Sequence, residues 1–178
     1  MSIPDGGPPA LSTPRLRLRA PQATDAPRIA ALANDPDVAR MTTRMPHPYG
    51  LTDAEAFLEA CAAKDPAQET VFAIEHGDEG LVGMLGFHPD ETGRTEIGYW
   101  LGRPYWGQGL ATEATGAALN WAGQDWKRRY LLAGHFADNP ASGQVLCKTG
   151  FLYTGDVVLR HSLARGAPAP TRMMVWLA

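Results

Sequence analysis

Two glycines stand where a strand-like run passes into a helix-like run. Gly107 and Gly109 flank Gln108 in the stretch RPYWGQGLATEA, residues 103–114. The first N–H groups of a helix have no partner within the helix, and the macrodipole makes that end locally positive. Glycine lacks a Cβ and tolerates left-handed backbone angles, so an anion can approach the main chain closely. The stretch therefore predicts a diphosphate cradle, with an ordinary tight turn as the alternative.

Two common phosphate-binding motifs do not fit this stretch. A P-loop needs Gly-x-x-x-x-Gly-Lys-Ser/Thr, and no lysine follows Gly109 in this turn. The dinucleotide fingerprint G-x-G-x-x-G/A fits only in part, because Thr112 occupies its third small position. That fingerprint belongs on the first strand of a βαβ unit, whereas this stretch comes late in the chain and follows a hairpin. A nicotinamide dinucleotide is therefore disfavoured.

The elements that must position this turn follow from the periodicity of the apolar residues. Alternation and turn signals predict strands over 15–20, 70–76, 81–88, 95–101, 130–136, 151–163 and 171–178. Helical spacing and cap residues predict helices over 24–33, 52–63, 109–123 and 138–150, the last with Asn139 as its cap. Thr52 is the expected cap of the second helix, with Glu55 completing a capping box. The segment 34–50 contains three prolines and is interpreted as a structured loop.

This order of elements predicts an α/β fold with a mixed sheet of about seven strands and about four helices. One domain is expected over residues 15–178, because 178 residues are too few for two comfortable cores. Residues 1–14 are rich in Pro, Gly and Ser and show no periodicity, which favours a flexible tail.

Composition excludes several classes of protein. Hydrophobic residues make up 44% and charged residues 20% of the chain, which is typical of globular proteins. The formal net charge of -3 provides no basic field for nucleic acid. No run approaches the roughly 20 apolar residues of a membrane span, and the N-terminus lacks the apolar core of a signal peptide, so a cytoplasmic location is expected. Cys61 and Cys147 have no metal-ligand spacing, so no metal is expected.

The stretch TEIGYWLGRPYWGQGLATEA resembles the acetyl-CoA signature of the GCN5-related N-acetyltransferase (GNAT) family. It is especially similar to the RimJ/RimL-like branch, which acetylates ribosomal-protein N-termini. The segments TPRLRLRAP, NDPDVAR, MPHPYGLTDAEAFL and DNPASGQVLCKTGFLYTGD extend the resemblance over nearly the whole chain. One departure is that Pro104 stands where the family pattern Gln/Arg-x-x-Gly-x-Gly/Ala has a basic or amide residue, with Arg103 one place early.

The resemblance implies the GNAT fold, a mostly antiparallel sheet whose fourth and fifth strands splay apart to hold acetyl-CoA. The pyrophosphate would be cradled by the main chain of Gly107, Gln108, Gly109, Leu110, Ala111 and Thr112. The strand edge at the splay would pair with pantetheine and supply an N–H for the acetyl oxygen; its residues are Trp100, Leu101 and Gly102. Asn139 would bond to the pantetheine arm and Ser142 would lie near the sulfur.

Glu96 and Ser142 are the catalytic candidates. An amine attacks only when neutral, so a base or a water-linked path to one is useful. Glu96 occupies the strand position that carries the general base in the histone-modifying relatives, and an ordinary polar contact is the alternative. Many family members protonate the leaving thiolate with a tyrosine on the helix after the fifth strand, which this sequence lacks. The resemblance implies Ser142 there as a hydrogen-bond donor.

The expected acceptor is a primary amine, on a protein N-terminus or a small molecule, that attacks acetyl-CoA directly in a ternary complex. Loops beside the first helices and the last hairpin would recognise it, with His47, Tyr49 and His161 as candidates. The resemblance also implies a homodimer through the C-terminal strands. A non-catalytic acyl-CoA-binding module is the alternative function, because it would keep the glycine cradle and need neither Glu96 nor Ser142.

Overall fold

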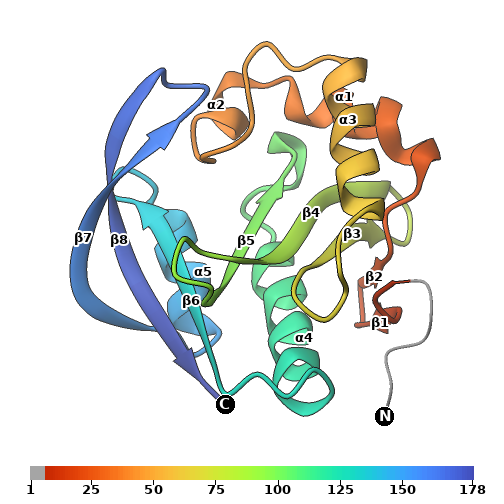
Figure 1. The fold of residues 1–178 in the computed structure, drawn as a ribbon. Coiled ribbons are helices and arrows are strands. Elements are labelled where there is room, and N and C mark those ends of the chain that lie inside the picture. The colour runs from red at the N-terminus through yellow and green to blue at the C-terminus, as the bar shows by residue number, and fades with distance from the viewer. Residues whose placement is uncertain (1–6) are drawn as a thin grey trace.

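A computed structural model describes residues 7–178 and shows an α/β fold (Figure 1). Its strands are β1 (Leu11–Ser12), β2 (Leu16–Arg19), β3 (Thr70–His76), β4 (Gly80–Pro89), β5 (Thr95–Leu101), β6 (Tyr130–Phe136), β7 (Leu152–Ser162) and β8 (Ala167–Leu177). Its helices are α1 (Ala26–Ala33), α2 (Pro36–Ala39), α3 (Leu51–Ala62), α4 (Leu110–Gln124) and α5 (Pro140–Lys148). Two short 3-10 turns, η1 (Ala23–Asp25) and η2 (Arg103–Tyr105), precede α1 and α4.

All these strands belong to one sheet in the order β1-β2-β3-β4-β5-β6-β8-β7. Neighbouring strands are antiparallel except β5 and β6, which run parallel. The predicted mixed, mostly antiparallel sheet is thus confirmed. β5 and β6 are in register only at Glu96 with Leu132 and Ile97 with Ala133, near the start of both strands. Beyond these residues the two strands separate.

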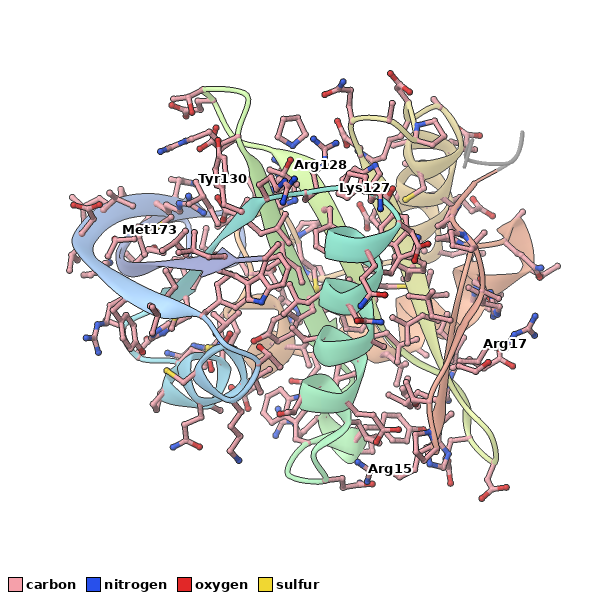
Figure 2. All side chains as sticks on the ribbon, turned by 90° about the horizontal axis from the view of Figure 1, so that it is seen from below. Arg15, Arg17, Lys127, Arg128, Tyr130 and Met173 are labelled. Carbon is pink, nitrogen blue, oxygen red and sulfur yellow. The ribbon has the colours of Figure 1, made fainter. Side chains whose placement is uncertain are left out.

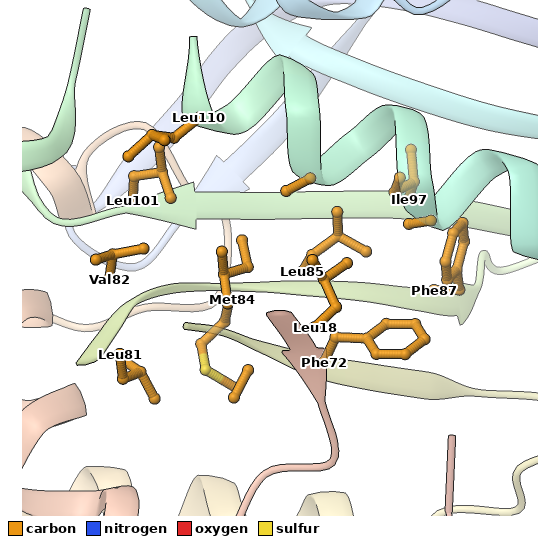
Figure 3. Close-up of a cluster of buried hydrophobic side chains, with 14 of the residues drawn as sticks. Leu18, Phe72, Leu81, Val82, Met84, Leu85, Phe87, Ile97, Leu101 and Leu110 are labelled. Atoms are coloured by element: carbon orange, nitrogen blue, oxygen red, sulfur yellow. The ribbon is translucent and has the colours of Figure 1, made fainter. Parts of the chain in front are cut away.

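Helices cover both faces of the sheet. Helices α1 and α3 lie on one side of β4 and β5, and α4 and α5 lie on the other (Figure 1). Figure 3 shows α4 over the sheet, with Ile97 and Leu101 of β5 pointing toward it and Met84 of β4 pointing away. These sides are called the α4 face and the α1 face below.

Helix α4 packs closely because its inner side is lined by small residues. Ala114, Ala118 and Ala122 recur every four residues and are fully buried. Near the end of the helix, Trp121 stacks on Trp126 with ring centroids 5.3 Å apart, and Phe72 and Phe87 of the sheet pack against this pair. The start of α4 is therefore fixed relative to β5 by a well-packed core.

The segment 34–50, predicted to be a loop, contains the short helix α2. Its cap is Asp35, whose carboxylate accepts the N–H of Asp37, and Pro36 stands at the first helical position. Proline is favoured at that position because its missing N–H would have no partner there. Reading the proline only as a helix breaker concealed this helix.

Two boundaries also differ from the sequence expectations. Helix α3 is capped by Gly50, whose N–H donates to the Asp53 carboxylate at 2.8 Å, so the predicted Thr52 and Glu55 capping box is wrong. β1 lies inside the segment expected to be a tail and pairs with β2; residues 1–6 lie outside the described residues. Among residues 7–178, no helix has the length and apolar character needed to cross a membrane.

Candidate functional site

The glycine turn at the start of α4 presents a row of unused main-chain donors. Gly107 and Gly109 have φ angles of 72° and 76°, in the left-handed region that favours glycine. A Cβ built on Gly107 would meet nothing within 4 Å, so open space lies over the turn. Within the described chain, no main-chain N–H of residues 107–112 donates to another residue, and the first helical bond runs from Glu113 N–H to Gly109 O. Unpartnered N–H groups at a helix start are the kind of donors that bind anions in proteins.

Arg15, in the bend just before β2, fixes this turn. Its Nη1 donates to the Gln108 carbonyl at 2.8 Å, and its Nε donates to Glu113 Oε2 at 2.7 Å. Figure 2 shows Arg15 beside the start of α4, whereas Arg17, two residues further along in β2, points away. Burial raises the pKa of Glu113, but hydrogen bonds from Thr13 and Arg15 outweigh it and lower the pKa overall. Sequence reasoning did not connect Arg15 with the turn, because 93 residues separate it from Gln108.

Arg103, which stands one place from the basic position of the family pattern, is engaged elsewhere. Its guanidinium donates to Asp35 at 2.7 and 2.6 Å and to Asp37 at 2.5 Å. The side chain therefore ties η2 to the start of α2. The positive charge nearest to the turn in the described contacts comes from Arg15 instead.

The splay between β5 and β6 exposes main-chain groups of alternate residues. Gly102 donates its N–H to Val82 O at 2.9 Å, and the Trp100 carbonyl lies against Gly83, so both residues direct these groups toward β4. By the alternation of an antiparallel ladder, Tyr99 and Leu101 direct theirs toward β6. Of the three residues expected at this edge, Leu101 alone faces the splay with its main chain, and the predicted cofactor contacts of Trp100 and Gly102 stay predictions. Sequence alone does not reveal which alternate main-chain groups of β5 form hydrogen bonds with β4.

Helix α5 brings Ser142 to the splay on the α4 face. Asn139 caps the helix as predicted, with Oδ1 accepting the Ser142 N–H at 3.3 Å. The Tyr99 hydroxyl lies 2.9 Å from Ser142 Oγ, so β5 and α5 meet at these two side chains. Burial raises the pKa of Tyr99 to about 12. Sequence reasoning placed Tyr99 on the face opposite Glu96 but gave it no role.

Glu96 lies buried on the α1 face in an ion pair. Arg160 of β7 donates from Nη2 to Oε2 at 2.9 Å and from Nη1 to Oε1. The pKa of Arg160 is raised chiefly by this hydrogen bonding with Glu96. The ordinary polar contact, which was the alternative role expected for Glu96, is thus present. Each carboxylate oxygen keeps a second lone pair, so the role of Glu96 as a base stays a proposal.

The ion pair lies beside a hollow and a half-buried histidine that the sequence did not single out. His88 pairs with Glu96 across β4 and β5, and its ring extends over Gly98, with Cε1 3.7 Å from where a Cβ of that glycine would be. Burial, followed by the charge of Arg44, lowers the pKa of His88. The hollow, of about 270 Å³, is lined by Arg94, Leu132, Thr154, Asp156, Val157, Val158, Arg160 and Met173.

The turn between β7 and β8 docks on the loop after α2. Ser162 Oγ donates to Thr42 O at 2.8 Å, and Leu163 N–H donates to Thr43 O at 3.0 Å. Arg165 donates to Asp138 with both Nη atoms at 2.8 Å, which connects this turn to the start of α5. Three segments that are distant in sequence thus form one wall of the α1 face.

The three acceptor candidates fare differently. Tyr49 belongs to the hydrophobic core, where burial raises its pKa to about 12, and its predicted contact with the acceptor stays a prediction. His161 is exposed, and strand alternation directs it away from the side on which Arg160 reaches Glu96. Of these two adjacent residues, Arg160 points inward, whereas His161 was the candidate expected from the sequence. His47 is exposed on the loop before α3.

The arrangement can support acyl transfer between two ligands. The free N–H groups of the glycine turn and the hydroxyls of Tyr99 and Ser142 lie on the α4 side of the splay. The ion pair of Glu96 with Arg160 and the hollow lie on the α1 side. Residues 7–178 contain no group of three His, Cys, Asp or Glu side chains placed to hold a metal ion.

Comparisons with known proteins give the same result. Residues 15–152 match the family described as "Acetyltransferase (GNAT) domain". The N-acetyltransferase YoaA of Bacillus subtilis is 29% identical over 175 residues, which are 93% of this chain and 94% of that protein. A ribosomal-protein-serine acetyltransferase of Escherichia coli is 34% identical over 87 residues, 48% of each chain. A solved structure of RimL with coenzyme A has the same fold, with a TM-score of 0.82 at 17% identity over 95% of this chain and 98% of that one.

Proposed function

We propose, from the premise that this chain belongs to the GNAT acetyltransferase family, that it transfers acetyl from acetyl-CoA to a primary amine by direct attack in a ternary complex. Family membership makes it an acetyl-CoA-dependent N-acetyltransferase, and the proposal concerns the acceptor and the residues that act. The observation that carries it is the row of unpartnered N–H groups at residues 107–112, next to a sheet that opens between β5 and β6.

The chain fits acetyl-CoA at both of these features. The N–H groups at 107–112 would hold the pyrophosphate, because the helix start is locally positive and Gly107 leaves room over the turn. The Leu101 edge of β5 and the Asn139 amide would hold the pantetheine arm. The thioester would supply the activated acetyl group, and Leu101 N–H would face its oxygen as an oxyanion donor.

The amine would approach from the α1 face, where Glu96 and His88 lie. An ammonium must first lose a proton, and Glu96 or a water molecule bound to it would accept that proton. The new C–N bond then forms as the C–S bond breaks, the electron pair of the broken bond stays on sulfur, and the acylated nitrogen loses its extra proton to water. Ser142, on the α4 side of the splay, would donate a hydrogen bond to this thiolate.

A protein N-terminus is the acceptor that we favour. Its support is the relative from Escherichia coli, whose name gives ribosomal-protein serine as its substrate, although the match spans about half of that protein. The hollow beside Arg160 has a mainly apolar floor with Leu132 and Met173, and charges at Arg94 and Asp156, which suits the residues that follow a free terminus. His47 would lie at the mouth of this site.

The test is release of free coenzyme A from acetyl-CoA with a panel of amines. The panel should contain peptides with free N-terminal Ser, Ala, Met and Thr, the same peptides with blocked termini, and small polyamines and amino sugars. Rapid release with the free peptides alone supports the proposal. Release with polyamines alone assigns a small-molecule acceptor. Binding of acetyl-CoA without release by any amine would favour the non-catalytic binding module.

A homodimer through β7 is also part of the proposal. β7 is an edge strand of the described sheet, and Leu152, Val157 and Leu159 expose 65%, 62% and 72% of their surface. A long apolar edge of this kind invites pairing or aggregation unless it is covered. Light scattering of the purified protein should give twice the chain mass, and Leu159→Lys should shift it toward the monomer. If the protein is a monomer at every concentration measured, the proposed homodimer through β7 is contradicted.

A further inference from the structure

Tyr99 reaches across the splay to the residue proposed to face the sulfur. Its hydroxyl lies 2.9 Å from Ser142 Oγ and 3.2 Å from the Ser142 carbonyl oxygen, either of which can accept its single proton, although the two residues are 43 positions apart. The described residues provide no other hydrogen bond to Ser142 Oγ. A strand side chain and a helix side chain therefore share one polar contact beside the divergence of β5 and β6.

The direction of this contact decides what Ser142 can do. A serine hydroxyl and a tyrosine hydroxyl each have one proton and two lone pairs. The tyrosine oxygen is the weaker acceptor of the two. If the Tyr99 proton points to Ser142 Oγ, the Ser142 proton is free to point elsewhere. If the Ser142 proton points to Tyr99 instead, the serine has no donor left for a ligand. Oγ is the nearer of the two acceptors around Tyr99, at 2.9 against 3.2 Å.

We propose that Tyr99 is a positioning residue that donates to Ser142 Oγ and thereby directs the Ser142 proton toward the leaving sulfur of coenzyme A. This inference rests on the proposed function. A hydroxyl that accepts a hydrogen bond is polarised and becomes a stronger donor, so the two groups act as a short chain.

Tyr99 itself is too weak an acid to protonate the thiolate. Burial raises its pKa to about 12, whereas thiols have pKa values near 8.5, so proton transfer from Tyr99 to sulfur would run uphill. The electron pair of the broken C–S bond stays on sulfur, and the thiolate takes its proton later from solvent. Tyr99 and Ser142 stabilise the charge by hydrogen bonding without losing a proton.

The first test measures binding without turnover. Calorimetry should compare coenzyme A with desulfo-coenzyme A at pH 7 and pH 9, for the wild type, Tyr99→Phe and Ser142→Ala. A donor aimed at sulfur favours the thiolate, so in the wild type coenzyme A should gain affinity over the desulfo compound as the pH rises. In both variants, the pH-dependent gain in affinity for coenzyme A should be smaller by roughly fivefold. Their affinity for desulfo-coenzyme A should equal that of the wild type. If Tyr99→Phe keeps the gain that Ser142→Ala loses, the proposal is overturned.

Tyr153→Phe is the matched control. Its hydroxyl bonds to His135 Nε2 at 2.9 Å and packs against Gly143, the neighbour of Ser142 in α5, but makes no hydrogen bond to Ser142 within the described residues, so its removal should leave the pH-dependent gain intact. A loss of the gain in this control as large as in Tyr99→Phe would show a general packing effect and would also overturn the proposal.

The second test is a double-mutant cycle in turnover. Tyr99→Phe and Ser142→Ala should each lower kcat with an acceptor identified by the amine panel, with KM for acetyl-CoA unchanged. The double variant should be no slower than Ser142→Ala, because Tyr99 acts only through Ser142. Effects that multiply would contradict this. If the wild type turns over no amine, the proposed function fails, and the calorimetric comparison still decides the role of Tyr99.

Discussion

The two sides of the splay are built in different ways. On the α4 face, the anion-binding turn is six consecutive residues that act through their main chain. On the α1 face, Glu96 of β5, His88 of β4 and Arg160 of β7 meet through their side chains. A contiguous main-chain site needs only the right backbone angles, whereas the side-chain site needs several distant segments to fold correctly. The first side should tolerate most substitutions other than those of its glycines, and the second should be sensitive to single side chains.

The largest expected effect is on the α1 face. Arg160→Met removes the partner of a buried carboxylate, so the free energy of unfolding should fall by about 3 kcal/mol. Chemical denaturation followed by tryptophan fluorescence measures the loss. The double variant Glu96→Gln with Arg160→Met should recover most of it, because no buried charge remains.

Arg94→Met is the control for this prediction. Arg94 lines the same hollow and pairs with Asp90, but its side chain is 51% exposed. Exposed pairs contribute less than about 1 kcal/mol. If Arg160→Met costs no more than Arg94→Met, the ion pair with Glu96 does not hold the α1 face together.

A smaller effect is expected on the α4 face. Arg15→Met removes the hydrogen bond to Gln108 O and the pair with Glu113, which should loosen the turn and weaken acetyl-CoA binding by about fivefold, near 1 kcal/mol. Arg17→Met is the matched control, because Arg17 lies only two residues further along, in β2, and points away from α4 (Figure 2). Equal affinities of the two variants would show that Arg15 does not support the turn.

The smallest expected effect concerns pH. Burial lowers the pKa of His88 in the fold, and the nearby charges are Arg44, Glu96, Glu69 and Lys64. The unfolded chain then binds a proton more readily than the fold, so stability is lost as the pH falls below about 6.5. Between pH 7.5 and pH 5, the wild type should lose on the order of 1 kcal/mol or less beyond what His88→Asn loses. A steeper loss in the variant would contradict the sign.

The same contrast explains how much could be predicted from the sequence. The strands at 70–76, 95–101 and 130–136 are where periodicity placed them, because local alternation determines them. The glycine turn was found because its function depends on consecutive residues. Asn139 was identified as a cap by the same local logic.

Contacts between distant segments could not be predicted in this way. Arg160 and Glu96 are 64 residues apart, and nothing in either local stretch indicates the other. Choosing His161 over Arg160 was a choice between the two faces of one strand, and only the packing of β7 against the sheet settles it. Trp100 and Gly102 were chosen at the splay because alternation of side chains does not say which main-chain groups pair with β4.

The central claim is that the bare N–H groups after Gly107 grip the diphosphate of coenzyme A. Calorimetric titration of acetyl-CoA into Gly107→Ala and Gly93→Ala tests it directly. Both glycines have left-handed φ angles, 72° and 81°, and open space at the Cβ position, so both variants carry similar backbone strain. The account predicts at least about tenfold weaker binding for Gly107→Ala and unchanged binding for Gly93→Ala. Wild-type affinity in Gly107→Ala would contradict it.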